Sequence, residues 1–418
     1  MTIIVNGTQY SIERDMTLLS FLREELSLTG TKDGCSEGAC GACSVIIDGK
    51  LVKACTRRLS RLDGCSITTI EGLSAREKDV YSYAFATAGA VQCGFCTPGM
   101  IIAAKALIDK VPDPSDEEIR KAIRGNICRC TGYVKIEAGI KLAARMLREN
   151  EDVPAQDTDP RISGTMVRID AIEKALGTGI FADDIRIEGM LYAAAVRSPA
   201  PRCRIVRIDD EAAKADPRCV AVIKADSVPY NRHGHIVPDW PVLIPEGDIT
   251  SYIGDAICLV IASERDALDE LKDKVRIEYE VLDGVFTPQD ALKDIIPVHQ
   301  GQSNIYDTER IVRGDADKAI AESDIVITET FTTPFTEHAF MEPECAIGYP
   351  YADGVLVYAG DQSVYDDQRE IARMLCLPKE KVRIKSTLVG GGFGGKEDMS
   401  VQHHAAPPND NDYDAGSF

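Results

Sequence analysis

The sequence contains no apolar run long enough to span a bilayer, since stretches such as Ala256–Ala262 are far too short. It also has no basic surplus, because 47 Lys and Arg stand against 67 Asp and Glu, a formal net charge of −20. Such a surface would repel the phosphates of nucleic acid, and without a spanning apolar run no membrane is expected as a partner either. The N-terminal residues MTIIVNGTQYSIE lack the basic start and apolar run of a signal peptide. We therefore expect a cytoplasmic protein, and its 418 residues suffice for several domains.

Cysteine is plentiful, with fourteen residues against six histidines and one tryptophan. Because cytoplasmic cysteines rarely form disulfides, clustered ones are interpreted as metal ligands. Eight fall into two quartets: Cys35, Cys40, Cys43 and Cys55, then Cys93, Cys96, Cys128 and Cys130. The other six are interpreted as small apolar residues: Cys65, Cys203, Cys219, Cys258, Cys345 and Cys376. Thiolates suit soft centres, so each quartet predicts zinc or an iron–sulfur cluster.

The first quartet favours a cluster over zinc. Cys35, Cys40 and Cys43 follow the C-x4-C-x2-C spacing of plant-type 2Fe–2S ferredoxins, whereas structural zinc sites usually use two short C-x2-C pairs. Three glycines would let the loop curl around the sulfides with unusual φ values: Gly34, Gly38 and Gly41. Residues 1–75 are interpreted as hairpin, helix, glycine loop, hairpin and strand, which predicts a β-grasp ferredoxin domain.

The second quartet lies in a segment, residues 76–150, that is predicted to be all helical. Helices are expected over Asp79–Ala90, from Pro98 to about Lys110, from a Ser115/Glu118 capping box to Gly125, and over Tyr133–Arg148. One cysteine pair would precede the second helix and the other the fourth. Helix N-termini would then offer N–H groups to an anionic cluster, with zinc as the alternative.

The remaining chain is predicted to continue as α/β structure. Residues 151–165 are a polar, proline-containing linker, and residues 166–285 alternate strands and helices. A further domain starts near 286, with a strand expected over Ile325–Thr332. The predicted fold class is therefore multidomain α+β, with a β-grasp domain, a helical bundle and then α/β domains.

Residues Gly390–Glu397 form a glycine-rich loop, GGGFGGKE, that satisfies two generic phosphate-binding patterns. The P-loop interpretation fails because Glu397 stands where Ser or Thr should bind magnesium. A dinucleotide site needs a further βαβ unit, which the residues beyond the loop do not supply with conviction. Alone, the glycines indicate a close backbone approach or a bare tight turn.

Together these motifs resemble the molybdenum hydroxylases, the xanthine dehydrogenase and aldehyde oxidoreductase family. Two groups of segments carry the resemblance: GCSEGACGACSV, QCGFCTPGM and GNICRCTGY for the cluster motifs, and LYAAAVRSPAPRCRI, YIGDAICLVIAS, AFMEPECAIGY and VGGGFGGKE for the molybdopterin subunit. The resemblance covers nearly all of residues 1–406 in the family's domain order. It implies a hammerhead-like domain over 166–285 and a partial molybdopterin-binding domain over 286–418.

The resemblance also implies a function and site residues. The implied enzyme hydroxylates a purine, N-heterocycle or aldehyde with oxygen from water, and its molybdenum–molybdopterin cofactor loses electrons through two 2Fe–2S clusters to a FAD subunit or other acceptor. The two quartets would bind the clusters, with Gln92 and Cys130 touching the pterin. Gln362 is similar to the glutamine beside the metal, and Glu397 to the substrate-facing acid, the alternative being a solvated carboxylate. The loop of backbone donors would contain Gly392, Phe393 and Gly394.

The sequence departs from the family after Ala406, where PPNDNDYDAGSF replaces several hundred further residues. We expect a split or interrupted gene or a frameshift, and a chain that needs a complementary molybdopterin chain to retain that cofactor. The main alternative is a non-catalytic electron-transfer protein with two clusters. A zinc-binding interaction module is the third hypothesis.

Overall fold

The computed structural model describes residues 1–155 and 166–406. They fall into two compact units: the first contains Met1–Ile187, His338–Arg369 and Lys379–Ala406, and the second contains Glu188–Glu337 and Glu370–Pro378. No helix within these described ranges has the length and hydrophobicity that crossing a membrane requires.

The first unit begins with a five-stranded sheet in the order β2-β1-β5-β3-β4. Its strands are β1 (Thr2–Val5), β2 (Thr8–Ser11), β3 (Ser44–Ile47), β4 (Lys50–Lys53) and β5 (Ser66–Thr68). Both hairpins turn at the predicted pairs, Asn6-Gly7 and Asp48-Gly49, where all four residues have positive φ. The predicted helix is present as α1 (Leu18–Ser20), continued by a π-helical turn over Phe21–Glu25. Sheet and helix share one apolar core, which confirms the β-grasp prediction.

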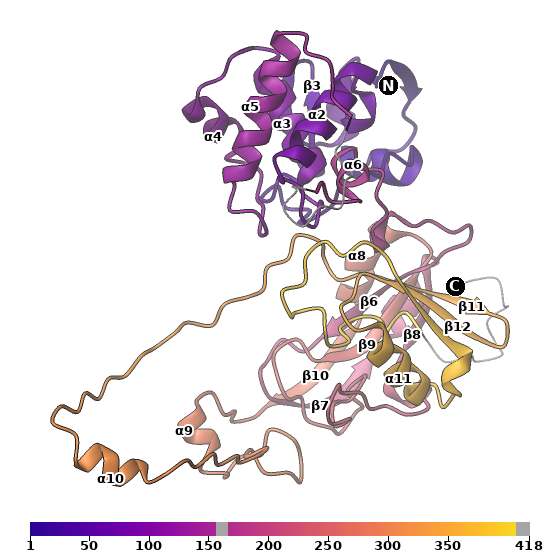
Figure 1. Cartoon of the computed structure of the whole chain (residues 1–418). Helices are drawn as coiled ribbons and strands as arrows, with labels where there is room; N and C mark the ends of the chain where they lie inside the picture. Colours follow the sequence, from indigo (N-terminus) through magenta and orange to yellow (C-terminus); the bar gives the residue numbers. More distant parts are fainter. Residues whose placement is uncertain (156–165, 407–418) are drawn as a thin grey trace. The chain divides into compact units, whose positions relative to one another are not determined.

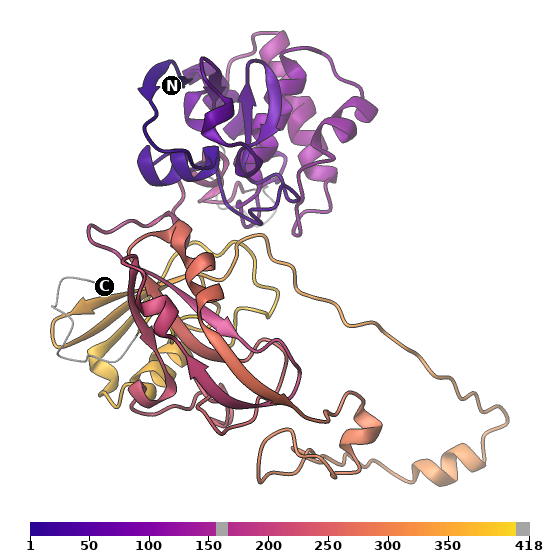
Figure 2. The same ribbon diagram turned by 180° about the vertical axis from the view of Figure 1, so that it is seen from behind.

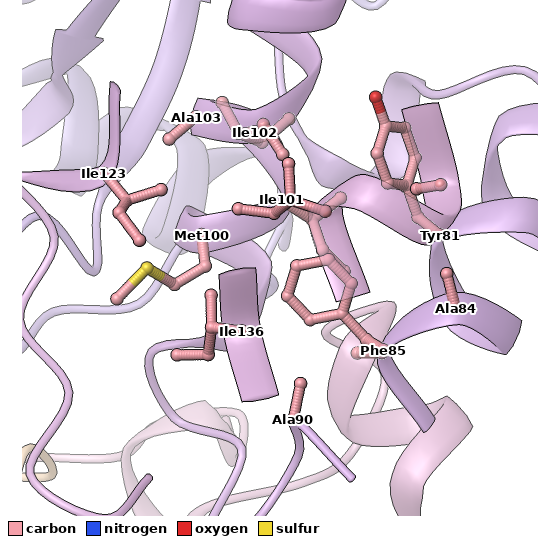
Figure 3. Packing of buried hydrophobic residues seen from close by; sticks show 14 of the residues in the cluster. Tyr81, Ala84, Phe85, Ala90, Met100, Ile101, Ile102, Ala103, Ile123 and Ile136 are labelled. Atoms are coloured by element: carbon pink, nitrogen blue, oxygen red, sulfur yellow. The ribbon is translucent and has the colours of Figure 1, made fainter. Parts of the chain in front are cut away.

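Four helices follow, as predicted. They are α2 (Ala75–Thr87), α3 (Thr97–Ile108), α4 (Asp116–Ile123) and α5 (Val134–Arg148). The Ser115/Glu118 capping box is formed, and a second box from Ser74 and Glu77 starts α2 at Ala75 rather than at the expected Asp79. Figure 3 shows the core that these helices enclose, which includes Phe85, Met100, Ile101 and Ile136.

The first unit also contains a three-stranded sheet, β11-β12-β13, and a short helix, α6 (Ala171–Ala175). The strands are β11 (Ala346–Tyr351), β12 (Gly354–Ala359) and β13 (Val382–Ser386), and α11 (Val364–Met374) lies between the last two in sequence. Because β12 and β13 are parallel neighbours, both strands finish at the same edge of the sheet, the one formed by their carboxyl ends. Gln362 follows β12 and the glycine-rich loop follows β13, so this edge brings the two together.

The second unit contains a three-stranded antiparallel sheet, β6-β9-β8, and a separate antiparallel pair, β7 with β10 (Figures 1 and 2). The elements are β6 (Tyr192–Arg197), β7 (Cys203–Asp209), α7 (Glu211–Lys214), β8 (Cys219–Ile223), β9 (Ala256–Ala262), α8 (Leu268–Lys274) and β10 (Arg276–Val281). The central strand β9 is buried along its whole length, which explains its continuous apolar sequence.

The strand predicted over Ile325–Thr332 is wrong. The chain between β10 and Glu337 contains only α9 (Pro288–Ala291) and α10 (Ala316–Ala321) as regular structure, and Ile327 and Phe331 are 79% and 88% exposed. β-Branched residues favour an extended backbone, but a strand also needs a hydrogen-bonded neighbour. The described residues of this unit provide no such neighbour for this segment.

Candidate cofactor sites

The ferredoxin-domain quartet consists of Cys35, Cys40, Cys43 and Cys55, and its sulfurs converge. The thiols of Cys43 and Cys55 are hydrogen-bonded to each other, and the Cys40 N–H donates to Cys35 Sγ at 3.4 Å. Cys43 immediately precedes β3, whereas Cys55 lies in the 3₁₀ turn after β4. The β3–β4 hairpin therefore returns the distant fourth thiol to the other three.

The loop glycines serve two different purposes. Gly38 and Gly41 have φ values of 77° and 75°, as predicted for a backbone that curls around a cluster. Gly34 does not adopt positive φ, so that part of the prediction is wrong. A Cβ at Gly34 would lie 3.2 Å from Cys40 Sγ and 3.0 Å from the Met341 carbonyl oxygen, so glycine there avoids a tight contact with both.

The packed thiols resist joint ionisation. The hydrogen bond from Cys43 lowers the pKa of Cys55 to about 7, while the same bond raises the pKa of Cys43. Burial raises the pKa of Cys40 to about 11. A cationic iron centre would supply the charge that allows all four sulfurs to bind as thiolates.

The helical-domain quartet consists of Cys93, Cys96, Cys128 and Cys130. Thiol hydrogen bonds join Cys93 to Cys130, Cys96 to Cys128, and Cys128 to Cys130, so these sulfurs also form one group. Cys96 is the N-cap residue of α3, and the Cys128–Cys130 turn comes just before α5. Thr131 adds a hydroxyl donor 3.2 Å from Cys128 Sγ.

Each quartet offers four free cysteine thiols, which is the ligand set that a 2Fe–2S cluster requires. A tetrahedral zinc site needs four ligands around one ion, whereas a 2Fe–2S cluster shares four thiolates between two irons. The donor set of each quartet therefore fits a 2Fe–2S cluster.

The two quartets lie in segments that are hydrogen-bonded to each other. The Ile127 N–H donates to the Cys40 carbonyl at 2.8 Å, and Asn126 Nδ2 donates to the Gly41 carbonyl at 2.9 Å. Ile127 is the neighbour of Cys128, so one hydrogen bond joins a residue of one quartet to the residue next to the other. Phe95 and Phe181 pack edge to face beside this junction, with ring centroids 5.2 Å apart.

The glycine-rich loop holds the side chain of Gln362. Gln362 Oε1 accepts from the Gly394 N–H at 3.1 Å and the Lys396 N–H at 3.4 Å, and the Gln362 N–H donates to the Lys396 carbonyl at 2.8 Å. Phe393 and Gly394 have φ values of 57° and 89°, which turn the loop back on itself. The structure therefore brings Gln362 together with Gly392, Phe393 and Gly394, and their roles at a cofactor stay predictions.

Replacing Gly392 by alanine is expected to displace the Gln362 amide. A Cβ at Gly392 would lie 2.2 Å from Gln362 Oε1, and the flexible glutamine is the group that can move. We expect loss of its bonds to the loop, with about 1 kcal/mol or less of destabilisation. The matched control is Gly125→Ala in the same unit, because its φ is not positive and a Cβ there would lie 3.7 Å from the Lys53 side chain, an ordinary contact. Crystal structures of both variants should show Gln362 moved only in G392A, and an unmoved Gln362 there would contradict the prediction.

A buried ion pair anchors both ends of the loop, and sequence reasoning missed it. Lys396 Nζ lies 2.7 Å from Glu342 Oε2, and the same oxygen accepts from the Gly390 N–H at 2.6 Å. Both side chains are at most 2% exposed, and the ammonium lies 4.7 Å from the centroid of the Phe340 ring. The pair thus fixes where the loop begins and ends.

The loop is also joined to the helical-domain quartet. Arg129 Nε donates to the His338 carbonyl at 3.0 Å, and a Cβ on Gly395 would lie 2.7 Å from the His338 ring. Arg129 stands between Cys128 and Cys130. His338 therefore contacts both the turn that carries Cys128 and Cys130 and the loop that holds Gln362.

The other predicted site residues lie at the surface. Gln92 and Glu397 are exposed, and Phe393 is 50% exposed. The Glu397 N–H donates to the Gly394 carbonyl at 3.4 Å, while its carboxylate faces solvent. These side chains are accessible to a bound molecule, and their roles stay predictions.

Comparison with known proteins identifies the class to which this fold and these sites belong. Models of four domain families match in order: the 2Fe–2S iron–sulfur cluster binding domain (3–64), the 2Fe–2S binding domain (69–141), the aldehyde oxidase and xanthine dehydrogenase a/b hammerhead domain (176–283) and the molybdopterin cofactor-binding domain (298–407). The cofactor predictions, two 2Fe–2S clusters and molybdopterin, are confirmed at the level of these domains.

Individual relatives agree. The aldehyde oxidoreductase of Megalodesulfovibrio gigas is 33% identical over 94% of this chain and 46% of its own length. The small FeS subunit of nicotinate dehydrogenase from Eubacterium barkeri is 51% identical over 33% of this chain and 90% of that subunit. The solved structure of the Desulfovibrio gigas aldehyde oxidoreductase superposes with a TM-score of 0.90 at 31% identity, covering 97% of this chain and 47% of that one.

The chain belongs to the molybdenum hydroxylase family, as the sequence motifs indicated. It spans about half the length of the aldehyde oxidoreductases that it matches along nearly its whole length. Some relatives are named as separate subunits, a small FeS subunit and a large molybdopterin subunit in E. barkeri.

Proposed function

We propose that this chain carries the 2Fe–2S clusters and part of the molybdopterin site of a hydroxylase. The enzyme would hydroxylate an aldehyde, purine or other N-heterocycle with oxygen from water. The substrate classes are supported by relatives named aldehyde oxidoreductase, nicotinate dehydrogenase and probable xanthine dehydrogenase. When bound, the molybdopterin cofactor would supply the two-electron oxidation of the substrate.

The chain's own residues would bind and orient the cofactors. The ferredoxin-domain quartet and the helical-domain quartet would each ligate one 2Fe–2S cluster. Gln362, held by the glycine-rich loop, would present its amide toward the cofactor, and Gly392, Phe393 and Gly394 would line the cofactor with backbone groups. Gln92 and Cys130 would contact the pterin, and the exposed Glu397 carboxylate would face the substrate.

The observation that carries this proposal is a continuous set of contacts from the glycine-rich loop to the ferredoxin-domain quartet. Gly395 packs on His338, whose carbonyl accepts from Arg129 beside Cys128 and Cys130. Ile127, on the other side of Cys128, donates to the Cys40 carbonyl. Short connected paths favour transfer of single electrons between centres, so the arrangement suits two clusters acting in series.

The domain boundaries and partners belong to the same proposal. Domains would span 1–75, 76–150, 166–285 and 286–418, with the linker 151–165 lying mostly outside the described residues. A complementary molybdopterin chain and a FAD subunit or another acceptor are proposed as partners. The existence of relatives named as separate subunits supports the idea of assembly from several chains.

The test is anaerobic expression of the chain with and without a complementary molybdopterin chain. We expect two distinct 2Fe–2S signals by electron paramagnetic resonance in both preparations, and a molybdenum signal with hydroxylase activity only with the complement. Two cluster signals without molybdenum in either preparation would favour the electron-transfer alternative. Colourless protein without iron would instead favour a zinc-binding module.

A further inference from the structure

Lys174 is a buried cation beside the turn that carries Cys93 and Cys96. Its side chain is 3% exposed, and its Nζ donates to the Gln92 carbonyl at 3.3 Å. Gly94, with φ +87°, lies directly against the lysine stem, because a Cβ there would be 2.6 Å from Lys174 Cβ. Burying an ammonium is unfavourable unless it has partners, so this position requires a specific physical explanation.

Lys174 shares its carboxylate partner with a second cation. Its ammonium lies 2.6 Å from Asp170 Oδ2, but the same carboxylate also pairs with Arg168 at 2.7 Å. Two cations therefore share one anion. The residues on either side of Cys93 both contact this lysine, Gln92 through its carbonyl and Gly94 through the lysine stem, so the positive charge lies beside the Cys93 turn.

We propose that Lys174 raises the reduction potential of the cluster bound by the helical-domain quartet. Reduction adds one electron to the cluster, and a fixed buried cation stabilises that added charge, because screening by water is weak there. Lys174 acts through the field and through its contact with the Gln92–Gly94 turn, so it is a positioning and tuning residue. This inference rests on the proposed assignment of the four thiols as cluster ligands.

The test is a potentiometric titration of the whole chain, followed by electron paramagnetic resonance, in wild type and Lys174→Met. Methionine keeps an unbranched apolar stem but removes the charge. We expect the helical-domain cluster to become harder to reduce by about tenfold in its redox equilibrium, about 59 mV for one electron. The ferredoxin-domain cluster is the internal control and should titrate as in wild type.

Asp170→Asn is the second variant, with the opposite expected sign. It removes the shared carboxylate, so the helical-domain cluster should become easier to reduce. An intact signal with unchanged potential in K174M would overturn the inference. If K174M does not assemble the helical-domain cluster, the test rests on D170N. An unchanged or lowered reduction potential of that cluster in D170N would then overturn the inference about Lys174. Failure of the ligand assignment is distinguishable, because wild type would then lack the helical-domain signal altogether.

Discussion

Replacing Cys128 by alanine is expected to abolish one of the two cluster signals and to leave the other intact. Cys128 Sγ is hydrogen-bonded to the thiols of Cys96 and Cys130 and to the Thr131 hydroxyl, so its loss removes the centre of the helical-domain quartet. Since each quartet would hold one 2Fe–2S cluster, bound iron should fall to about half. Iron and sulfide analysis with electron paramagnetic resonance on anaerobically purified protein measures both effects.

The matched control is Cys65→Ala. Cys65 lies in the ferredoxin domain, just before β5, but belongs to neither quartet. This variant should retain all of the iron and both signals. If C128A and C65A bound equal iron, the helical-domain quartet would not be a ligand set, and the serial arrangement of two clusters would have no basis.

Replacing Lys396 by methionine is expected to destabilise the first unit by about 3–5 kcal/mol. The change leaves the Glu342 carboxylate buried with only the Gly390 N–H opposite it. Removing one partner of a buried ion pair is costly because the remaining charge has lost its compensation. Burial already raises the pKa of Glu342, so part of the loss would be relieved by protonation. Denaturant unfolding monitored in wild type and variant gives the free-energy difference.

Lys141→Met is the matched control for this prediction. Lys141 pairs with Asp116 in the same unit, but both side chains are about half exposed. Exposed pairs contribute little, so about 0.5 kcal/mol or less is expected. The double variant Glu342→Leu with Lys396→Met should be less destabilised than K396M alone, because no charge is left unpaired. Equal losses in K396M and K141M would mean that the buried pair does not anchor the loop.

The sequence predicted those features that depend on neighbouring residues. The capping box at Ser115, the turns at Asn6-Gly7 and Asp48-Gly49, and the placement of both cysteine pairs near helix starts all depend on a few adjacent positions. The start of α2 was predicted too late, although Ser74 and Glu77 show the same spacing as Ser115 and Glu118.

Features that depend on distant residues were not predicted. Glu342 and Lys396 are 54 residues apart, and neither residue's burial is signalled by its local sequence. Lys174 and Gln92 are 82 residues apart, and a lysine in a short helix is usually exposed. The strand expected over Ile325–Thr332 failed for a related reason, because alternation of apolar and polar residues does not supply a neighbouring strand.

The most direct measurement is electron paramagnetic resonance on the anaerobically purified, dithionite-reduced chain, quantified against its iron content. Two 2Fe–2S clusters predict a brown protein with two distinguishable signals of about equal intensity, which C128A reduces to one. A protein that binds no iron, or that shows a single signal unaffected by C128A, would contradict the assignment of the eight thiols to two clusters.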